Sequence, residues 1–106
     1  MRVLKMCGDA YGYNVAPATM QVGAASAVLQ TSVDVCAARE AQLFRLFVES
    51  NAGTTEDVAI GFCNGGSFPV FLQSTGAQAT AASFIEGVTY LFSFDALSRK
   101  FFLVGF

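Results

Sequence analysis

The chain contains no histidine, and this absence removes several kinds of chemistry at once. Without histidine there is no Ser-His-Asp or Cys-His arrangement for nucleophilic catalysis and no histidine-ligated metal site. The phosphate-binding pattern G-x-x-x-x-G-K-[ST] is absent as well. We therefore expect a protein that is not an enzyme and holds neither a cofactor nor a metal ion.

Charged residues are scarce: six Lys and Arg and eight Asp and Glu make up 13% of the chain, and the net charge is −2. Soluble domains average about 25% charged residues. The basic residues do not cluster beyond Arg99 and Lys100, so we expect neither nucleic acid nor an anionic membrane surface as a partner. Hydrophobic residues make up 54% of the chain, including 11 Phe, and so few charges leave apolar surface that favours an oligomer or a larger assembly.

Targeting signals are also lacking. Asp9 interrupts the apolar stretch that follows Arg2 and Lys5, which is unlike a signal peptide. The longest uncharged run, residues 10–33, contains too many polar residues for a membrane span. We expect a protein made in the cytoplasm without a signal peptide.

The three cysteines have no C-x-x-C spacing, and their number is odd. Both features argue against a disulfide framework and against a zinc site. We expect all three, Cys7, Cys36 and Cys63, to be reduced, and Cys36 and Cys63 to act as small hydrophobic residues.

The end of the chain, residues 84–106, carries the clearest structural pattern. Alternate residues there would lie on opposite faces of a strand: Val88, Tyr90, Phe92 and Phe94 on one, and Thr89, Leu91, Ser93 and Asp95 on the other. This period of two is typical of a half-buried strand. Residues 95–100 hold most of the local charge and form a turn, and residues 101–106 are then apolar on both faces apart from Gly105. Such a strand is expected to be covered on both sides, by the core and by a partner.

Shorter strand-like runs recur along the rest of the chain. We predict strands at residues 27–35, 42–49, 56–62, 69–73 and 79–85. The loop between 42–49 and 56–62 is rich in turn residues, which predicts a hairpin, and residues 37–42 form a loop or one helical turn. About seven or eight short strands at regular spacing are typical of an all-β fold, here an antiparallel β-sandwich or a jelly-roll-like barrel.

Residues 1–27 differ from the remainder because they contain no Phe and are rich in Ala and Gly. Two interpretations stay open for them: an arm that pairs with a neighbouring subunit, or irregular strands that close the same sheet. We accordingly divide the chain into an N-terminal segment, 1–27, and a β-sandwich domain, 28–106.

Aromatic residues supply the candidate binding positions. Stacking on a sugar is one use of such residues, and the candidates for it are Tyr11, Tyr13, Phe68 and Tyr90. The commoner use is to fill a β core or a subunit interface, where each ring buries a large area. The predicted interface residues are Tyr11, Tyr13, Phe102, Val104 and Phe106.

Two stretches carry a resemblance to a known class of proteins. The first is Cys36-Ala-Ala-Arg39 … Leu43-Phe-Arg-Leu-Phe47 … Asn51-Ala-Gly53 … Asp57-Val-Ala-Ile-Gly-Phe62, and the second is Gly87-x-x-Tyr90 … Phe94-Asp95 … Phe102-Leu-Val104. They resemble small β-sandwich structural proteins of tailed bacteriophages, of the capsid decoration, head-fibre and tail-associated types. Gln42 and Leu43 depart from that pattern, which has Ser or Thr after the Ala-Arg pair.

The resemblance implies a virion structural protein without catalytic residues. The expected role is a capsid decoration or cement protein that binds copies of itself, with a trimer as one candidate, and other virion proteins such as the major capsid protein. The alternative is a phage tail or receptor-binding module that recognises glycans through exposed aromatics and polar loops such as residues 74–78. A third interpretation is a non-viral β-domain, such as a small adhesin or an accessory module of an enzyme.

Overall fold

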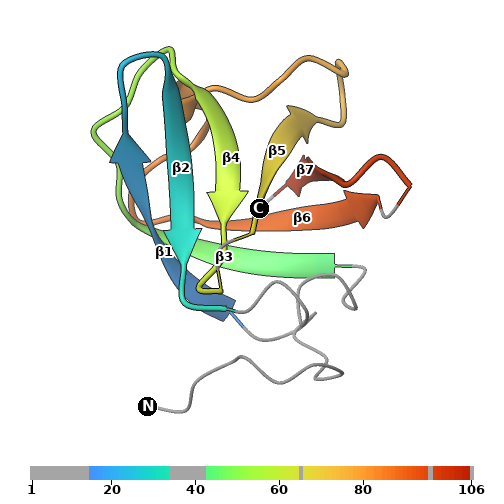
Figure 1. Cartoon of the computed structure of the whole chain (residues 1–106), viewed down its shortest axis with the longest axis horizontal. Coiled ribbons are helices and arrows are strands. Elements are labelled where there is room, and N and C mark those ends of the chain that lie inside the picture. The colour runs from blue at the N-terminus through green and yellow to red at the C-terminus, as the bar shows by residue number, and fades with distance from the viewer. Residues whose placement is uncertain (1–14, 34–42, 65, 96, 106) are drawn as a thin grey trace.

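The computed structural model describes residues 15–33, 43–64, 66–95 and 97–105, and these form a closed seven-stranded β-barrel (Figure 1). The elements along the chain are β1 (Val15–Val22), β2 (Ser26–Thr31), β3 (Leu43–Ser50), β4 (Asp57–Gly61), β5 (Ser67–Leu72), the 3-10 helix η1 (Ala81–Ser83), β6 (Thr89–Asp95) and β7 (Lys100–Gly105). Around the barrel the strand order is β1-β2-β4-β5-β7-β6-β3, and β3 closes the ring by pairing with β1.

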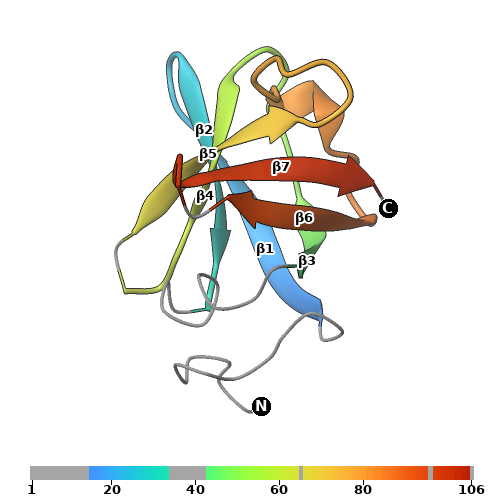
Figure 2. The same cartoon turned by 90° about the vertical axis from the view of Figure 1, so that its right-hand side faces the viewer.

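The barrel mixes parallel and antiparallel neighbours. The pairs β1–β3, β2–β4 and β5–β7 are parallel, whereas β1–β2, β4–β5, β3–β6 and β6–β7 are antiparallel. Figure 2 shows β6 and β7 lying side by side as one of the antiparallel pairs. The described chain is thus all-β, as the sequence predicts, but its sheet is closed and mixed in place of the expected antiparallel sandwich or jelly-roll-like barrel. Alternation along a strand identifies its buried face and carries no information about the direction of its neighbours.

The predicted hairpin between residues 42–49 and 56–62 does not form. Both segments are strands, β3 and β4, but β3 pairs with β1 and β6, and β4 pairs with β2 and β5. The loop between them is held against η1 instead, because the N–H of Ala82 donates to the carbonyl oxygen of Thr54 at 2.8 Å and that of Ala81 to Glu56 at 2.9 Å. Residues 79–85, predicted as a strand, contain η1, with only an isolated bridge from Thr80 to Asp57.

The N-terminal segment 1–27 contributes to the barrel from residue 15 onwards. Its β1 is bonded on both sides, to β2 and to β3, so the barrel extends across the predicted division at residue 28. Residues 1–14, with Tyr11 and Tyr13, lie outside the described residues, and so do residues 34–42, which include the predicted loop or helical turn.

The core lies inside the barrel and is dominated by phenylalanine. The Phe101 side chain is fully buried. Its ring centroid lies 4.8–6.5 Å from those of five other rings: Phe44, Phe62, Phe68, Phe92 and Phe94. Aromatic pairs at these separations add to the stability that burial of their area already gives. The strand at the end of the chain is therefore fixed to the barrel by its inward face, which leaves its outward face for other contacts.

Candidate protein-binding surface

Apolar side chains lie on the outer side of the barrel over β3, β6, β7 and the strands next to them. On these strands Phe44, Tyr90, Phe92 and Phe101 point inward, so the residues that alternate with them point outward. We name this surface the outer apolar face; its apolar members are Val15, Leu43, Phe47, Phe71, Leu91, Phe102 and Val104. Three of them, Val15, Leu43 and Val104, are each 45% exposed.

The strand register arranges this face in rows. One row runs Val15, Arg45, Leu91, Gly105 across β1, β3, β6 and β7. The adjacent row runs Leu43, Ser93, Phe102, Phe71 across β3, β6, β7 and β5. Residues that are opposite in neighbouring strands lie within contact distance of each other, so the face is continuous.

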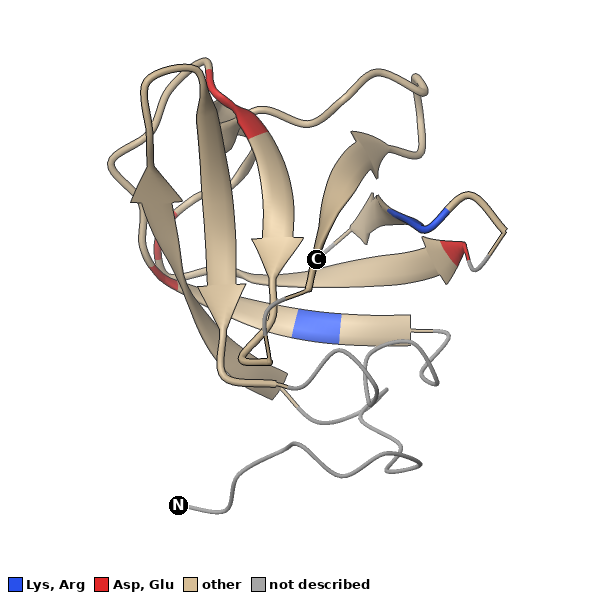
Figure 3. Cartoon of the chain, in the orientation of Figure 1, with Lys and Arg blue, Asp and Glu red and all other residues tan. Residues whose placement is uncertain are grey.

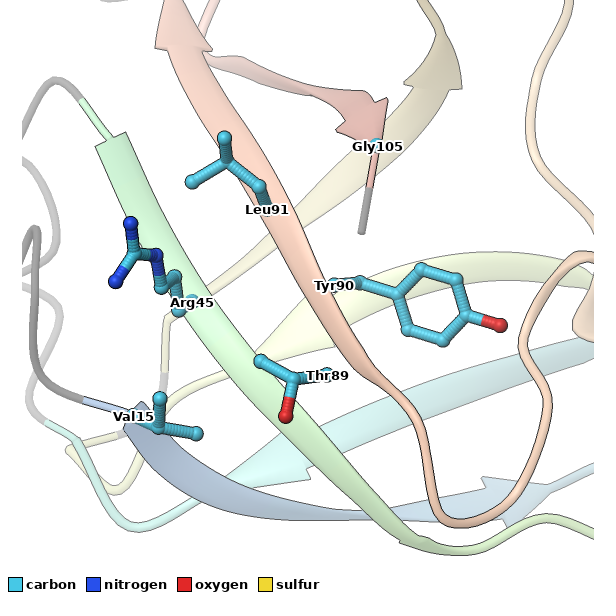
Figure 4. Close-up of a pocket in the computed structure, with 6 residues that line it drawn as sticks. All are labelled: Val15, Arg45, Thr89, Tyr90, Leu91 and Gly105. Carbon is cyan, nitrogen blue, oxygen red and sulfur yellow. The ribbon is translucent and has the colours of Figure 1, made fainter.

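A hollow of about 410 Å³ opens in this face. Six residues line it: Val15, Arg45, Thr89, Tyr90, Leu91 and Gly105 (Figure 4). Gly105 leaves it open, because a Cβ atom at that position would meet no heavy atom within 4 Å. A bulge lies beside it: the partner of Leu91 is Gly105 and that of Phe92 is Leu103, which leaves Val104 between them.

Tyr90 and Leu91 point to opposite sides of β6 (Figure 4). The Tyr90 side chain is buried, and its hydroxyl oxygen accepts a hydrogen bond of 2.6 Å from the backbone N–H of Ile85. Leu91 points outward beside Arg45 and is half-buried. The inner ring thus fixes β6 in place, while its outer neighbour forms the wall of the hollow.

Arg45 is the one charged residue in the first of these rows. Its neighbours across the strands are Val15 and Leu91, and its neighbours on the same face of β3 are Leu43 and Phe47. Arg45 as a whole is half-buried, and its guanidinium has no hydrogen-bond or ion-pair partner within the described part of the chain. Figure 3 shows a basic band on β3, with the acidic segments at strand ends and in loops. The face therefore offers a cationic donor group surrounded by apolar side chains.

The structure places two of the five predicted interface residues on this face. The ring of Phe102 lies 6.2 Å from that of Phe71, and Lys100 places its Nζ atom 4.5 Å from the centroid of the Phe71 ring. Val104 lies at the bulge next to the hollow. The other three, Tyr11, Tyr13 and Phe106, lie outside the described residues.

Five residues of this face are not among the predicted interface residues: Val15, Leu43, Arg45, Leu91 and Gly105. One signal for two of them was present, because Leu43 and Leu91 are apolar residues on the side of a strand that alternation assigns to solvent. No local signal marks Val15 or Gly105, since the register of β1, β3, β6 and β7 alone brings them together.

The turn between β6 and β7 is a second exposed feature. The Leu97 side chain at its tip is 98% exposed. The Asp95 carboxylate accepts a hydrogen bond of 2.9 Å from the Ser98 hydroxyl and one of 3.1 Å from the N–H of Leu97. These two bonds, the one from Ser98 foremost, hold the pKa of Asp95 below its usual value. Arg99 has a φ of 55° and lies next in the turn.

The structure also shows where three other residues discussed from the sequence lie: Phe68, Tyr90 and Cys63. Tyr90 is buried and presents no ring face to solvent, whereas Phe68 is half-buried and packs its ring 5.7 Å from that of Phe94. Cys63 is exposed in a turn and is not the small core residue that we expected, because the Asn64 turn places it outside the barrel.

Within the described ranges no three or more cysteine or acidic side chains gather where they could hold a metal ion. None of the helical turns in that part of the chain has the length and apolar character that crossing a membrane requires. Comparisons of the chain with protein-family models, with curated proteins and with solved structures found no match.

Proposed function

We propose that this chain is a non-enzymatic structural protein that binds other protein chains through the outer apolar face. The observation that carries the proposal is the surrounding of Arg45 on that face. Its neighbours on its own and adjacent strands are apolar, and it has no ion-pair partner among the described residues. The buried centres of protein interfaces are enriched in aromatic residues and Arg, and are depleted in Lys, Glu and Asp. The scarcity of charge in the whole chain supports the same conclusion.

We also propose a narrower role as a capsid decoration or cement protein of a tailed phage, bound to copies of itself and to other virion proteins. The support for this role is the sequence resemblance of residues 36–62 and 87–104. Burial of ~1,600 Å² at ~25 cal/mol per Å² gives a large gross driving force, most of which is offset by ordering costs. On a repeating lattice, several weak contacts then add through avidity.

The described aromatics favour protein binding over the glycan-recognition alternative. A sugar platform needs exposed ring faces, and Tyr90 is only 3% exposed. Phe68 packs against three rings: Phe62, Phe94 and Phe101. Phe71 and Phe102 do reach the surface, but they share one row with Leu43 on a broad face, which suits a protein surface better than a sugar ring.

The test compares the native mass of the full chain with that of Phe102→Ser and Val104→Asp, and measures binding of each to capsids that lack the protein. We expect weaker self-association or weaker capsid binding for both variants. Val22→Ser is the matched control, because Val22 is 42% exposed but lies at the far end of β1. If Phe102→Ser and Val104→Asp bind as well as the unmodified chain, the outer apolar face is not the interface. Binding of the unmodified chain to a glycan array would support the alternative function.

A further inference from the structure

We propose that copies of this chain associate head to tail, with the β6–β7 turn of one copy seated in the hollow of the next. This inference rests on the proposed function and names the partner for one part of the outer apolar face. Two features of the same molecule carry it: an apolar tip with a carboxylate, and an apolar hollow with a cation that no described residue pairs.

The β6–β7 turn, which we call the tip, projects an exposed apolar side chain that could enter a hollow. Leu97 is 98% exposed, compared with 64% for Ile85, the next most exposed of the large hydrophobic residues described. Figure 1 shows the β6–β7 turn extending beyond the body of the barrel. The hydrogen bonds from Leu97 and Ser98 to Asp95 hold the turn in one conformation, so docking would cost little further conformational entropy in its backbone.

The hollow has the complementary chemistry. Val15, Leu91 and the bare backbone of Gly105 supply an apolar surface, and its volume of about 410 Å³ leaves room for a leucine side chain. Arg45 stands at its wall without an ion-pair partner in the described ranges. An apolar group that fills the hollow would remove water from beside Arg45. Its guanidinium would then need a hydrogen-bond acceptor from the docked group.

Asp95 supplies that acceptor on the tip. It lies two positions before Leu97, and its Oδ1 and Oδ2 atoms accept from the Leu97 N–H and the Ser98 hydroxyl respectively, which leaves lone pairs for a guanidinium. Two cations share the turn with it. Lys100 lies over the ring of Phe71 in its own barrel, whereas Arg99 is exposed and would approach Arg45 of the next copy. Arg99→Gly should accordingly strengthen the association, and a glycine also suits the φ of 55° at that position.

The two features lie at opposite ends of one hairpin, which sets the symmetry. Leu91 and Gly105 pair at one end of β6 and β7, and Asp95 and Lys100 pair at the other. A barrel therefore cannot fill its own hollow with its own tip, and the contact joins two different patches. Such heterologous contacts build a ring or an open filament. A two-fold contact centred on the hollow would bring two Arg45 side chains together without a counter-charge.

The test uses two variants that each disable one side of the contact. Leu97→Ser removes the apolar tip, and Gly105→Val fills the hollow at a position where a Cβ atom meets nothing within 4 Å. By sedimentation velocity we expect each variant alone to associate at least about tenfold more weakly than the unmodified chain. An equal mixture should form a 1:1 dimer and nothing larger, because only one intact tip and one intact hollow remain. Ile85→Ser, which removes an exposed residue elsewhere, should associate like the unmodified chain.

The charge pair is tested by exchange. Arg45→Glu and Asp95→Arg should each weaken association, and mixing the two variants should restore it. In the mixture, Asp95 on the tip of the first variant can meet Arg45 in the hollow of the second. The two exchanged side chains, Glu and Arg, also have opposite charge. If the mixture associates no better than either variant alone, the charge pair is not part of the contact.

The outcomes separate this inference from the proposed function. If the unmodified chain associates but Leu97→Ser and Gly105→Val leave its mass distribution unchanged while Phe102→Ser dissociates it, head-to-tail docking is overturned and the proposed function stands. A chain that stays monomeric yet binds capsids likewise overturns head-to-tail docking and leaves the proposed function in place. A chain that neither associates nor binds another protein overturns both.

Discussion

The side-chain amide of Asn51 donates a hydrogen bond of 2.6 Å to the carbonyl oxygen of Phe84, 33 residues later in the chain. The same nitrogen donates to the carbonyl oxygen of Ala81 at 2.8 Å, and Oδ1 accepts from the N–H of Gly53 at 2.8 Å. Asn51 thus ties the end of β3 to the far side of η1. Beyond this link the chain leads to β4, which pairs with β2 and β5 on another part of the barrel and forms no hairpin with β3.

Replacement of Asn51 by alanine should destabilise the barrel by about 1–3 kcal/mol, because the Phe84 carbonyl loses the Asn51 amide as its donor and the Ala81 carbonyl keeps only the N–H of Phe84. Asn51→Asp should destabilise it at least as much, since a carboxylate would face those carbonyl oxygens. Urea unfolding measures both changes. Gln21→Ala, an exposed change on β1, is the control and should alter the free energy of unfolding by less than about 0.5 kcal/mol. Equal stabilities of Asn51→Ala and the control would show that the link contributes nothing.

Tyr90→Phe should cost about 1–2 kcal/mol of stability, because the N–H of Ile85 loses the hydroxyl that accepts its hydrogen bond. The ring remains in the core beside Phe84, 5.1 Å away between centroids, so this packing contact is kept. Thermal unfolding measures the loss, and hydrogen exchange at the Ile85 amide should become faster. Unchanged exchange at that amide would contradict the assigned bond.

Gly61→Ala should destabilise the protein by about 1–3 kcal/mol through overpacking. A Cβ atom there would lie 2.6 Å from Val28 Cγ1 and 2.6 Å from Gln30 Oε1, on the neighbouring strand β2. The Gln30 amide can move away, but the branched Val28 side chain has few alternative rotamers. Gly105→Ala is the matched control and should be nearly neutral, because its Cβ atom meets no neighbour. If both glycines tolerate alanine equally well, the β2–β4 register is not as described.

Ser98→Ala should raise the pKa of Asp95 towards its ordinary value, because the Ser98 hydroxyl is the main group that holds it down. The lowered pKa means that Asp95 stabilises the folded state above its unfolded pKa of about 3.9 and that this contribution disappears as the pH falls through the folded pKa. A pH titration of the carboxyl carbon by NMR measures the shift. Glu56, whose pKa is lowered chiefly by the N–H of Thr54, should titrate as before in the variant. An unaltered Asp95 pKa would contradict the hydrogen bond.

The sequence located individual strands better than their partners. The predicted runs 42–49 and 56–62 contain most of β3 and β4, and the alternation around residue 90 put Tyr90 and Phe92 on one face, which is buried in the barrel. The reason is that a period of two is a property of a few neighbouring residues. The three parallel pairs depend on segments far apart in the chain, and no local pattern specifies them.

For the candidate surface, too, local sequence predicts some residues, whereas others depend on strand pairing. Phe102 and Val104 could be predicted because the last strand is apolar on both sides. The hollow could not, because it needs Val15 and Gly105, from opposite ends of the described chain, to meet in one row through Arg45 and Leu91. Arg45 likewise has no special sequence context until its four apolar neighbours are known.

The central claim is that the outer apolar face is covered by protein when this chain works. The most direct measurement is the native mass of the full, unmodified chain by light scattering or native mass spectrometry over a wide range of concentration. We predict a mass that increases with concentration in multiples of the monomer. A single monomer mass up to high concentration, with free solubility and no binding to capsids, would contradict the account.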